Sequence, residues 1–451
     1  MWVENVVLKN IRCFDNNELS FKRWDDKTEP SRWITLLGEN GTGKSTLLQA
    51  MSLLLAGPDG ARTLVPRPIG WLKDDTTYGT ISLVVHQGQH DKGEYGEERK
   101  YTRFSYYYYI TGEKTVKIQE REYNNPTIVE ASGYNARFLS WLKKNAFNSS
   151  GNGWFAAGYG AFRRLTRDNR IIIPSLESPA RYTNFYAHFE EDKGITSFER
   201  WLVYLDYRRI KDEDSSSVER QYQISIEAIN GVLPDGVKFD SVTSSGRIIF
   251  DIGGRKVPTI AMSDGFRSAL ALSGDMIWRL INAFPDSDTP LSEEGVVLID
   301  ELDIHLHPLW QRTMPGMLQT VFPNIQFIVA THSPLIAVGA GREALTYRLM
   351  NRDGVIKIDD VSQDIINSSA DDILTSPAFG LVSTFSPEVE HLLARYSELL
   401  ENRRLLSVNE TKELKQLELD LRGIAPYKVK DELTLKVEDY LRRKVEADDK
   451  D

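Results

Sequence analysis

The hydrophobic positions of the chain follow two periods, one typical of buried strands and one typical of amphipathic helices. Short apolar runs rich in β-branched and aromatic residues predict strands at residues 3–8, 18–21, 33–37, 78–86, 101–111, 114–119, 154–158, 237–242, 247–252, 296–299 and 326–330. Apolar residues spaced three or four apart predict helices at 45–54, 136–146, within 195–233, and at 264–283 and 308–321. Strands that alternate with helices along most of the chain predict an α/β protein.

The two ends of the chain have simpler patterns. The first two predicted strands form a hairpin with a polar turn at Asp15, Asn16 and Asn17. Residues 387–451 predict three amphipathic, charge-dense helices, separated at 407–409 and 423–426. Their apolar stripes suit docking on the chain's own core, and they equally suit a platform for a partner or a higher assembly.

Composition limits the class of protein. Of 451 residues, 41% are hydrophobic and 27% are charged, which excludes a wholly disordered chain. The 55 Lys and Arg residues against 65 Asp and Glu give a net charge of −10, which argues against a broad DNA-coating surface. The basic cluster of Arg163, Arg164, Arg167 and Arg170 is the exception. It would bind the DNA backbone or a nucleotide phosphate, or form an ordinary solvated face.

The only cysteine, Cys13, excludes an internal disulfide and any multi-cysteine metal site. No apolar run approaches the roughly 18 residues that span a bilayer, and the N-terminus lacks the pattern of a secretory signal. We therefore expect a cytoplasmic protein with no membrane segment.

A glycine-rich segment lies between the predicted strand at 33–37 and the predicted helix at 45–54. It matches the phosphate-binding loop pattern, and its candidate ATP-binding residues are Gly38, Glu39, Asn40, Gly41, Thr42, Gly43, Lys44, Ser45 and Thr46. The glycines let backbone N–H groups converge on phosphate oxygens, and the helix start adds its positive dipole end. Lys44 is predicted to reach the β- and γ-phosphates, and the Ser45 hydroxyl to ligate Mg²⁺.

The predicted strand at 296–299 ends in two acids, Asp300 and Glu301. A buried strand that ends in a carboxylate is how such folds bring an acid to the metal, so Asp300 is the candidate Mg²⁺ partner. Glu301 is the candidate catalytic residue that polarises the attacking water.

Two further segments bear on the kind of nucleotide enzyme. Ser263, Asp264 and Gly265 begin a predicted helix and would offer a hydroxyl and N–H groups to an anion, although a simple helix cap has the same pattern. His332 follows an apolar strand, where it would contact a γ-phosphate or serve the structure.

Other motifs leave more than one interpretation open. His305 and His307 lie two residues apart and would not share a helix face, which favours a role in shaping their loop over metal ligation. Four consecutive tyrosines, 106–109, would stack on nucleic-acid bases or pack in a sheet, and strand alternation favours packing.

In this order, the motifs resemble the ABC-type ATPase cassette of the SMC and RecF kind. In this resemblance, Ser263, Asp264 and Gly265 correspond to the signature segment, Asp303 to the D-loop and His332 to the switch histidine. The resemblance implies an ABC-ATPase-like P-loop fold with a mixed sheet, a β-meander subdomain, a helical insert and a C-terminal helical tail. It implies ATP hydrolysis with ATP and Mg²⁺ bound, and a homodimer or higher homo-oligomer in which Ser263, Asp264 and Gly265 of one subunit act in trans on the nucleotide held by the other. Gln87 and Gln89 are candidates for the Q-loop of this class.

Residues 159–164, 262–272, 299–308 and 322–334 further resemble the stand-alone bacterial ATPases that include the ATPase subunit of the Septu antiphage system and its retron-associated relatives. This resemblance implies that the ATPase gates a separately encoded effector nuclease, of the His-Asn-His (HNH) type. A DNA-repair ATPase of the RecF or SMC kind that clamps DNA is the alternative.

The motifs divide the chain into four parts. Residues 1–165 and 236–345 are expected to form the two halves of the ATPase lobe, 166–235 a helical insert, and 346–451 a mainly helical region for a partner or assembly.

Overall fold

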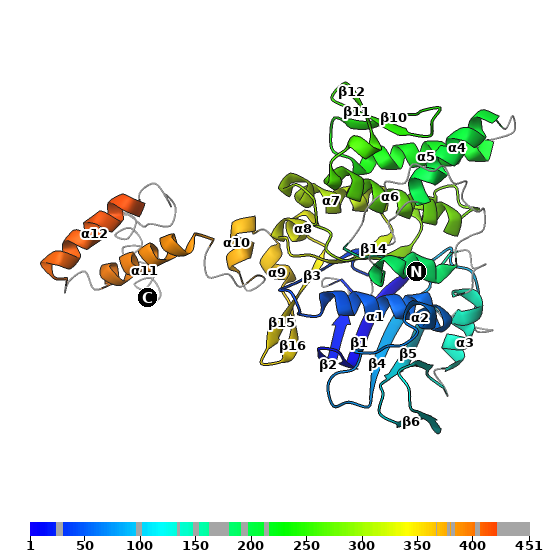
Figure 1. Ribbon diagram of the computed structural model, residues 1–451, viewed down its shortest axis with the longest axis horizontal. Coiled ribbons are helices and arrows are strands. Elements are labelled where there is room, and N and C mark those ends of the chain that lie inside the picture. The colour runs from blue at the N-terminus through cyan, green and yellow to red at the C-terminus, as the bar shows by residue number, and fades with distance from the viewer. Residues whose placement is uncertain are drawn as a thin grey trace, which may run out of the picture. The chain divides into compact units, whose positions relative to one another are not determined.

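The computed structural model forms two compact units, Met1–Gly380 and Leu381–Asp451 (Figure 1). It describes residues 1–23, 30–95, 102–132, 136–147, 153–161, 180–190, 197–211, 216–366, 368–376, 379, 384–401 and 406–421. The basic cluster at 163–170 and the last predicted helix of the tail lie outside the described residues.

A six-stranded sheet forms the centre of the first unit (Figure 1). Its order is β16 (Val355–Asp360), β15 (Leu345–Arg352), β3 (Trp33–Gly38), β14 (Ile325–Ala330), β13 (Gly295–Ile299) and β9 (Phe155–Tyr159). Every neighbouring pair is parallel except β15 with β16. The loops that follow β3, β14, β13 and β9 therefore leave the sheet at one edge, where ligands of open α/β sheets bind.

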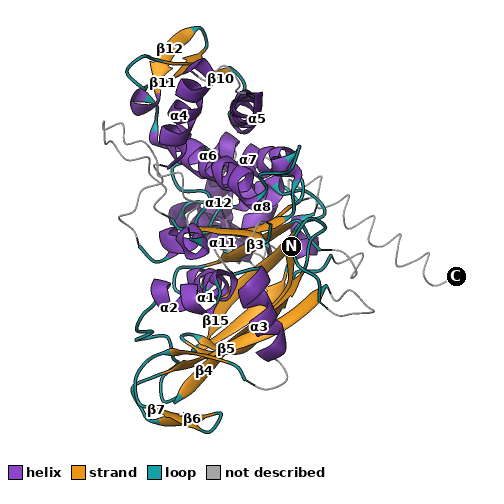
Figure 2. Ribbon diagram, turned by 90° about the vertical axis from the view of Figure 1, so that its right-hand side faces the viewer, coloured by secondary structure: helices purple, strands orange, loops and turns teal. Residues whose placement is uncertain are grey.

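Both faces of this sheet are covered, which is why its central strands are apolar on both sides. On one face, Val297 and Ile299 pack in a core shared with the helices α4 (Ser197–Lys211), α5 (Ser216–Val232), α6 (Asp264–Ala283) and α7 (Pro308–Val321). On the other face, Val296 and Leu298 pack with α1 (Lys44–Ala56) and a second sheet. Figure 2 shows the helices α4 to α7 gathered away from the strands β4 and β5.

The second sheet is antiparallel. Its order is β2 (Phe14–Ser20), β1 (Trp2–Ile11), β4 (Tyr78–His86), β5 (Arg103–Thr111) and β8 (Ile128–Glu130). The chain reverses at Arg12 and Cys13, so the predicted turn at 15–17 is wrong, because those polar residues lie within β2. The predicted α/β class with a mixed sheet and an antiparallel subdomain is confirmed.

The four tyrosines of β5 alternate as a strand requires. Tyr106 and Tyr108 are buried in the core below the sheet, whereas Tyr107 and Tyr109 are half-buried on its other face. Their rings meet edge to face at 5.3 Å. The sheet-packing interpretation of this run is confirmed.

Shorter elements complete the first unit. They are α2 (Pro58–Leu64), β6 (Val116–Ile118), β7 (Arg121–Tyr123), α3 (Ala136–Asn145), η2 (Arg181–His188), β10 (Val237–Val242), β11 (Ile248–Ile252), β12 (Arg255–Pro258), η3 (Thr259–Ala261), η4 (Pro290–Ser292), α8 (Pro334–Gly339), α9 (Ser362–Ile365) and α10 (Ala370–Thr375). The strand predicted at 114–119 pairs with β7 in a hairpin of its own and does not extend the meander. The sequence patterns missed β7, β8, β12, β15 and β16, of which β15 pairs with β3 and so carries the central sheet beyond residue 345.

The second unit contains two described helices, α11 (Pro387–Glu401) and α12 (Val408–Leu421). Their apolar stripes share one small core, formed by Tyr396, Leu399, Leu414, Leu417 and Leu421. The guanidinium of Arg395 on α11 donates two hydrogen bonds to the Glu413 carboxylate on α12, at 2.9 and 3.0 Å. The described stripes thus face each other across a helical hairpin.

Candidate nucleotide-binding site

The glycine-rich segment forms a tight loop between β3 and α1, as its pattern predicts. Gly41 and Gly43 have φ angles of +79° and +94°, which L side chains rarely adopt. A Cβ on Gly43 would lie 2.7 Å from both Cys13 Sγ and Phe14 Cζ, so the hairpin of the antiparallel sheet presses directly on the loop. Gly43 is also the N-cap of α1 and has no side chain to accept from the first-turn N–H groups, which suits these groups to bind an anion.

Lys44 is buried at the first position of α1. Its ammonium donates to the carbonyl oxygens of Gly38, at 2.7 Å, and Glu39, at 2.9 Å, so it bridges the start of the loop. Burial lowers the pKa of Lys44 below its usual value, and the carboxylates of Asp300, Glu301, Asp303 and Glu39 act in the opposite direction. Lys44 therefore lies near the acids that follow β13. The sequence alone does not show this proximity.

The other loop residues differ in exposure. Glu39, Asn40, Gly41 and Ser45 are exposed, whereas Thr42 and Thr46 are buried. The Thr42 hydroxyl donates to the Glu39 carbonyl at 2.8 Å and so stabilises the turn. The exposed Ser45 hydroxyl is accessible to a metal.

The strand β13 is buried along its whole length and delivers Asp300 to the ligand edge of the sheet. The Asp300 N–H donates to the Tyr159 carbonyl of β9 at 2.8 Å, one further bond of the parallel ladder. Glu301 follows with φ at +47°, an unfavourable conformation for a non-glycine residue. Such strain is typical of functional turns, and here it redirects the chain immediately after the paired acids.

Asp303 and His332, which are 29 residues apart, meet beyond the same edge. The Asp303 carboxylate accepts a short hydrogen bond from the Thr331 hydroxyl and a second one, at 3.3 Å, from the His332 backbone N–H. The Leu302 N–H donates to the Ala330 carbonyl at 3.2 Å, which continues the pairing of the two chain segments. The predicted D-loop and switch histidine thus form one hydrogen-bonded corner next to the acids.

The predicted signature segment begins α6, with Ser263 as its N-cap. Ser263 and Asp264 are exposed, and Gly265 is buried. A Cβ on Gly265 would lie 2.5 Å from the His305 carbonyl oxygen, so only glycine fits against the loop that follows the acids. The signature therefore packs on the loop after β13 while its polar residues point outward.

His305 and His307 serve the same loop. The Nδ1 atom of His307 accepts from the Leu309 N–H at 3.3 Å and caps α7. His305 has φ at +64° and supplies the carbonyl that contacts Gly265. Among the described residues, no group of three or more metal-ligating side chains lies together.

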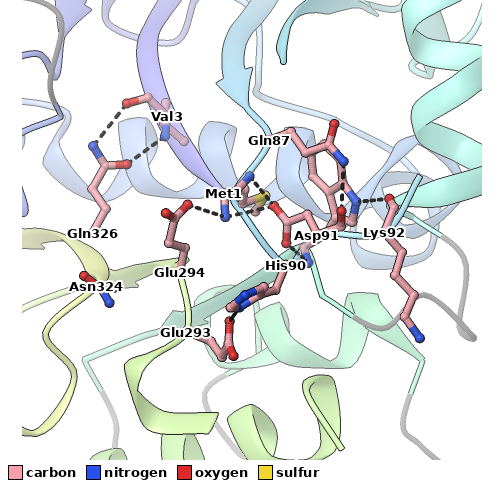
Figure 3. A network of polar contacts seen from close by, with 12 residues as sticks. Met1, Val3, Gln87, His90, Asp91, Lys92, Glu293, Glu294, Asn324 and Gln326 are labelled. Atoms are coloured by element: carbon pink, nitrogen blue, oxygen red, sulfur yellow. Dashed lines mark hydrogen bonds and ion pairs between the residues drawn. The ribbon is translucent and has the colours of Figure 1, made fainter. Parts of the chain in front are cut away.

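The two Q-loop candidates lie at the wrong end of the antiparallel sheet. Trp2 pairs with His86 and Lys9 pairs with Thr80, so the end of β4 is opposite the end of β1 that contacts α1. The Gln87 amide donates to the carbonyls of Asp91 and Gly93, at 2.8 and 2.7 Å (Figure 3). Gln87 thus belongs to the polar network around the Met1 ammonium, which lies 2.9 Å from the Asp91 carboxylate (Figure 3), whereas Gln89 is exposed.

Sequence reasoning missed Arg12, at the reversal between β1 and β2. Its guanidinium donates to the Thr46 hydroxyl at 3.2 Å and to the Gln49 side chain at 2.9 Å, and it stacks on the Trp71 ring at 4.5 Å. Burial lowers its pKa. Arg12 is the first residue after β1, and no local sequence pattern indicates this role, because its contacts on α1 are more than 30 residues away.

The oxygen donors near Lys44 suit Mg²⁺. This ion prefers oxygen ligands and is commonly held by one or two protein groups together with substrate phosphates. The carboxylate of Asp300 is one of the acids that oppose the lowering of the Lys44 pKa, and the parallel strands β3 and β13, which the Ser45 loop and Asp300 follow, end at the same edge of the sheet. Ser45 and Asp300 would hold the ion, which when bound would neutralise charge on the phosphates.

Comparisons with known proteins find relatives of this chain among bacterial proteins. The chain is 27% identical over 409 residues to the Septu protein PtuA of Bacillus mycoides (strain KBAB4), an alignment that covers 89% of this chain and 48% of that relative. It is 32% identical over 213 residues to the Retron Vc95 probable ATPase of Vibrio cholerae serotype O1 biovar El Tor, which covers 46% of this chain and 40% of that protein. The expected resemblance to these two groups is confirmed.

The chain spans about half the length of these relatives, or less. A solved structure titled as the crystal structure of the SmcHead bound to the C-winged helix domain of ScpA aligns with 80% of this chain and 98% of its own, at 15% identity and a TM-score of 0.49.

In the described part of the chain, no helix is both long and apolar enough to cross a bilayer.

The family comparison covers the site itself. Residues 34–338 match the model of the family described as "AAA domain, putative AbiEii toxin, Type IV TA system". This range runs from β3 into α8 and includes the phosphate loop, the signature, the acids after β13 and His332. The chain therefore belongs to this AAA-domain family.

Proposed function

We propose that this protein is a cytoplasmic ATPase that binds ATP and Mg²⁺, dimerises over the nucleotide, and uses hydrolysis to control a separately encoded effector nuclease in antiphage defence. The observation that carries the proposal is the juxtaposition of Lys44, in its glycine-rich loop, with the acids that follow β13. A buried lysine among carboxylates at the ligand edge of a parallel sheet suits a triphosphate with its metal.

Each residue has a chemical role in this proposal. Lys44 and the loop N–H groups bind the β- and γ-phosphates, and Ser45 and Asp300 hold Mg²⁺. Glu301 accepts a proton from the attacking water, or orients that water, and His332 contacts the γ-phosphate. Asp303 fixes the segment of His332 through its hydrogen bonds with Thr331 and the His332 N–H.

The exposure of the signature supports dimerisation. Ser263 and Asp264 are exposed at the N-terminus of a 20-residue helix, where backbone N–H groups and the helix dipole favour an anion. A triphosphate held by a second subunit would supply that anion. To move an equilibrium from 1:99 to 99:1, a ligand must favour one state by about 5.5 kcal/mol, and a nucleotide contacted by both subunits makes these extra contacts only in the dimer.

The effector is proposed from the relatives, one of which is a Septu protein and another a retron probable ATPase. An HNH nuclease encoded beside this gene is the proposed partner. Co-purification of the two chains, with DNA cleavage that responds to ATP, is the corresponding test. Cleavage by the nuclease at the same rate with and without this chain would contradict the proposed control.

The variant Glu301→Gln tests the ATPase and the dimer together. Since a general base contributes about 10²-fold to 10⁴-fold, turnover should fall by at least about a hundredfold while ATP still binds. The variant should then accumulate as an ATP-bound dimer, measured by light scattering with and without ATP and Mg²⁺.

A matched control is Glu343→Gln, because Glu343 has a 74% exposed side chain and pairs with Arg23 at the surface. This control should turn over like the unchanged protein. Normal turnover in Glu301→Gln would remove Glu301 from the reaction, and a Glu301→Gln protein that binds ATP yet stays monomeric would contradict the dimer.

A further inference from the structure

A cluster of buried polar side chains joins the strand β9 to the signature helix α6. The Tyr159 hydroxyl donates to Oδ2 of Asp275 at 2.9 Å, and Nε of Arg279 donates to the same oxygen at 2.5 Å. Tyr159 and Asp275 are each only 2% exposed. A buried ion pair is weak evidence for stability, because desolvation opposes the attraction, so its position in the fold is the more informative property.

Tyr159 also belongs to the nucleotide edge of the sheet. It is the last residue of β9, and its carbonyl accepts the hydrogen bond from the N–H of Asp300, the proposed Mg²⁺ ligand. Asp275 lies on the helix that begins immediately after Ser263. The side chain of Tyr159 thus contacts the signature helix, and its backbone contacts Asp300, so this one residue connects the two.

A second hydrogen-bonded connection between α6 and β9 runs through Asn184 of η2. Arg279 donates a short hydrogen bond to the Asn184 side-chain oxygen, and the Asn184 amide donates to the Ala156 carbonyl of β9 at 3.0 Å. In the described structure, Oδ1 of Asp275 is buried without a hydrogen-bond partner. The orientation of this carboxylate thus depends on the two bonds made by Oδ2.

The chemistry of the link favours a fixed donor. A tyrosine phenol, with an ordinary pKa of about 10, keeps its proton at neutral pH, and the Tyr159 hydroxyl donates it to the Asp275 carboxylate. Both partners of this bond are buried, and a hydrogen bond is stronger where water is excluded.

We propose that Tyr159 and Asp275 are positioning residues that couple the signature helix to the catalytic acids. Movement of α6, when Ser263 engages the nucleotide of a second subunit, passes through Asp275 to Tyr159 and from the Tyr159 backbone to Asp300. The coupling transmits the closure of the dimer to Asp300 and to Glu301 beside it. This inference rests on the proposed function.

The variant Tyr159→Phe removes the hydroxyl and keeps the ring and the backbone bond to Asp300. We expect kcat to fall about tenfold, while KM and the dissociation constant of the single subunit for ATP change less than twofold, because the link acts after binding. ATP-dependent dimerisation of the double variant Tyr159→Phe/Glu301→Gln should persist.

The matched control is Tyr108→Phe. Tyr108 is also fully buried, but its hydroxyl has no hydrogen-bond partner in the described structure and lies in the antiparallel sheet. A second variant, Asp275→Asn, addresses the other partner, with Ser273→Ala as its control on the same helix, since Ser273 is buried and its hydroxyl is unpartnered. Thermal unfolding of all four variants reports whether each one folds.

Three outcomes decide the matter. A loss of kcat in Tyr159→Phe that is absent from Tyr108→Phe supports the coupling. Equal kcat values for the two variants, or a loss of ATP affinity that accounts for the whole effect, overturns it. If the unchanged protein hydrolyses ATP at a rate per subunit that is independent of protein concentration and no dimer forms, the proposed function fails instead, whichever result the tyrosine variants give.

Discussion

Two glycines of the phosphate loop offer a paired test of how tightly the loop is packed. Gly41 and Gly43 both have positive φ angles, at +79° and +94°. A Cβ on Gly41 would meet nothing within 4 Å, whereas a Cβ on Gly43 would lie 2.7 Å from Cys13 Sγ and Phe14 Cζ. The variants Gly41→Ala and Gly43→Ala therefore share the backbone strain and differ in the steric clash.

The magnitudes follow from those two terms. The left-handed conformation costs an alanine about 1–2 kcal/mol, partly offset by the lower entropy of the unfolded chain, about 0.4–1 kcal/mol. Overpacking in a fixed core adds typically about 1–3 kcal/mol. Phe14 is completely buried and cannot rotate away, so the clash should be relieved by movement of the loop. Gly43→Ala should therefore be less stable than Gly41→Ala by about 1–3 kcal/mol.

Urea unfolding followed by tryptophan fluorescence measures the difference in stability, and titration with a fluorescent ATP analogue measures binding. We expect Gly43→Ala to lose most nucleotide affinity, because a displaced loop no longer converges its N–H groups on the phosphates. Gly41→Ala should lose less. Equal stability of the two variants, with equal nucleotide affinity, would refute the inferred packing of the hairpin against the loop.

Two further predictions concern the interface and the pH dependence. Lys44→Ala should not bind ATP, and Ser263→Arg should bind ATP as a monomer but not hydrolyse it. An equimolar mixture of the two variants should regain activity, because half of the dimers formed at random carry one intact site. A mixture that shows no activity in a coupled phosphate-release assay would argue against assembly in trans. Hydrogen bonds from Arg103, then from His86 and Lys22, hold the pKa of Glu4 far below its usual range against the opposing effect of burial. A depressed folded-state pKa stabilises the fold above the unfolded value of about 4.3, and this contribution is lost as the pH falls toward the folded value. The destabilisation caused by Glu4→Gln, measured by thermal unfolding, should thus be largest near pH 7 and shrink below about pH 4; an unchanged difference between pH 7 and pH 3 would contradict the role of the charge.

Neighbouring residues made the phosphate loop and the acids predictable. The loop needs a strand, three glycines, a lysine and a helix in immediate succession, and all of them lie between Trp33 and Ala56. The buried run that ends at Asp300 is equally local. Even the signature helix was predicted with its first and last residues, because its apolar spacing is regular over 20 residues. These features depend on interactions within one helix, strand or loop. Sequence periodicity reports such local interactions.

Local sequence patterns did not predict the features that depend on pairing between distant strands. Gln87 follows a strand, as a Q-loop residue would, yet the antiparallel pairing of β4 with β1 carries it to the far end of the sheet. The strands β15 and β16 were missed because β15 is recruited by the parallel edge of β3, a partner some 300 residues away. The predicted turn at 15–17 failed for a similar reason, since the polar residues of β2 lie on a strand whose pairing with β1 supplies their backbone hydrogen bonds.

The sequence by itself determined the candidate chemistry of this protein, namely a glycine-rich loop with a lysine that suits phosphates, two acids proposed to act on metal and water, and a helix start that suits an anion. Only the tertiary structure decided which of these groups meet. The order β3, β14, β13 and β9 brings Lys44, His332, Asp300 and Tyr159 to one edge, and the packing of α6 on β9 joins Tyr159 to Asp275, which is 116 residues away. Such contacts arise from the burial of whole faces of strands and helices, a collective energy that no short stretch of sequence encodes.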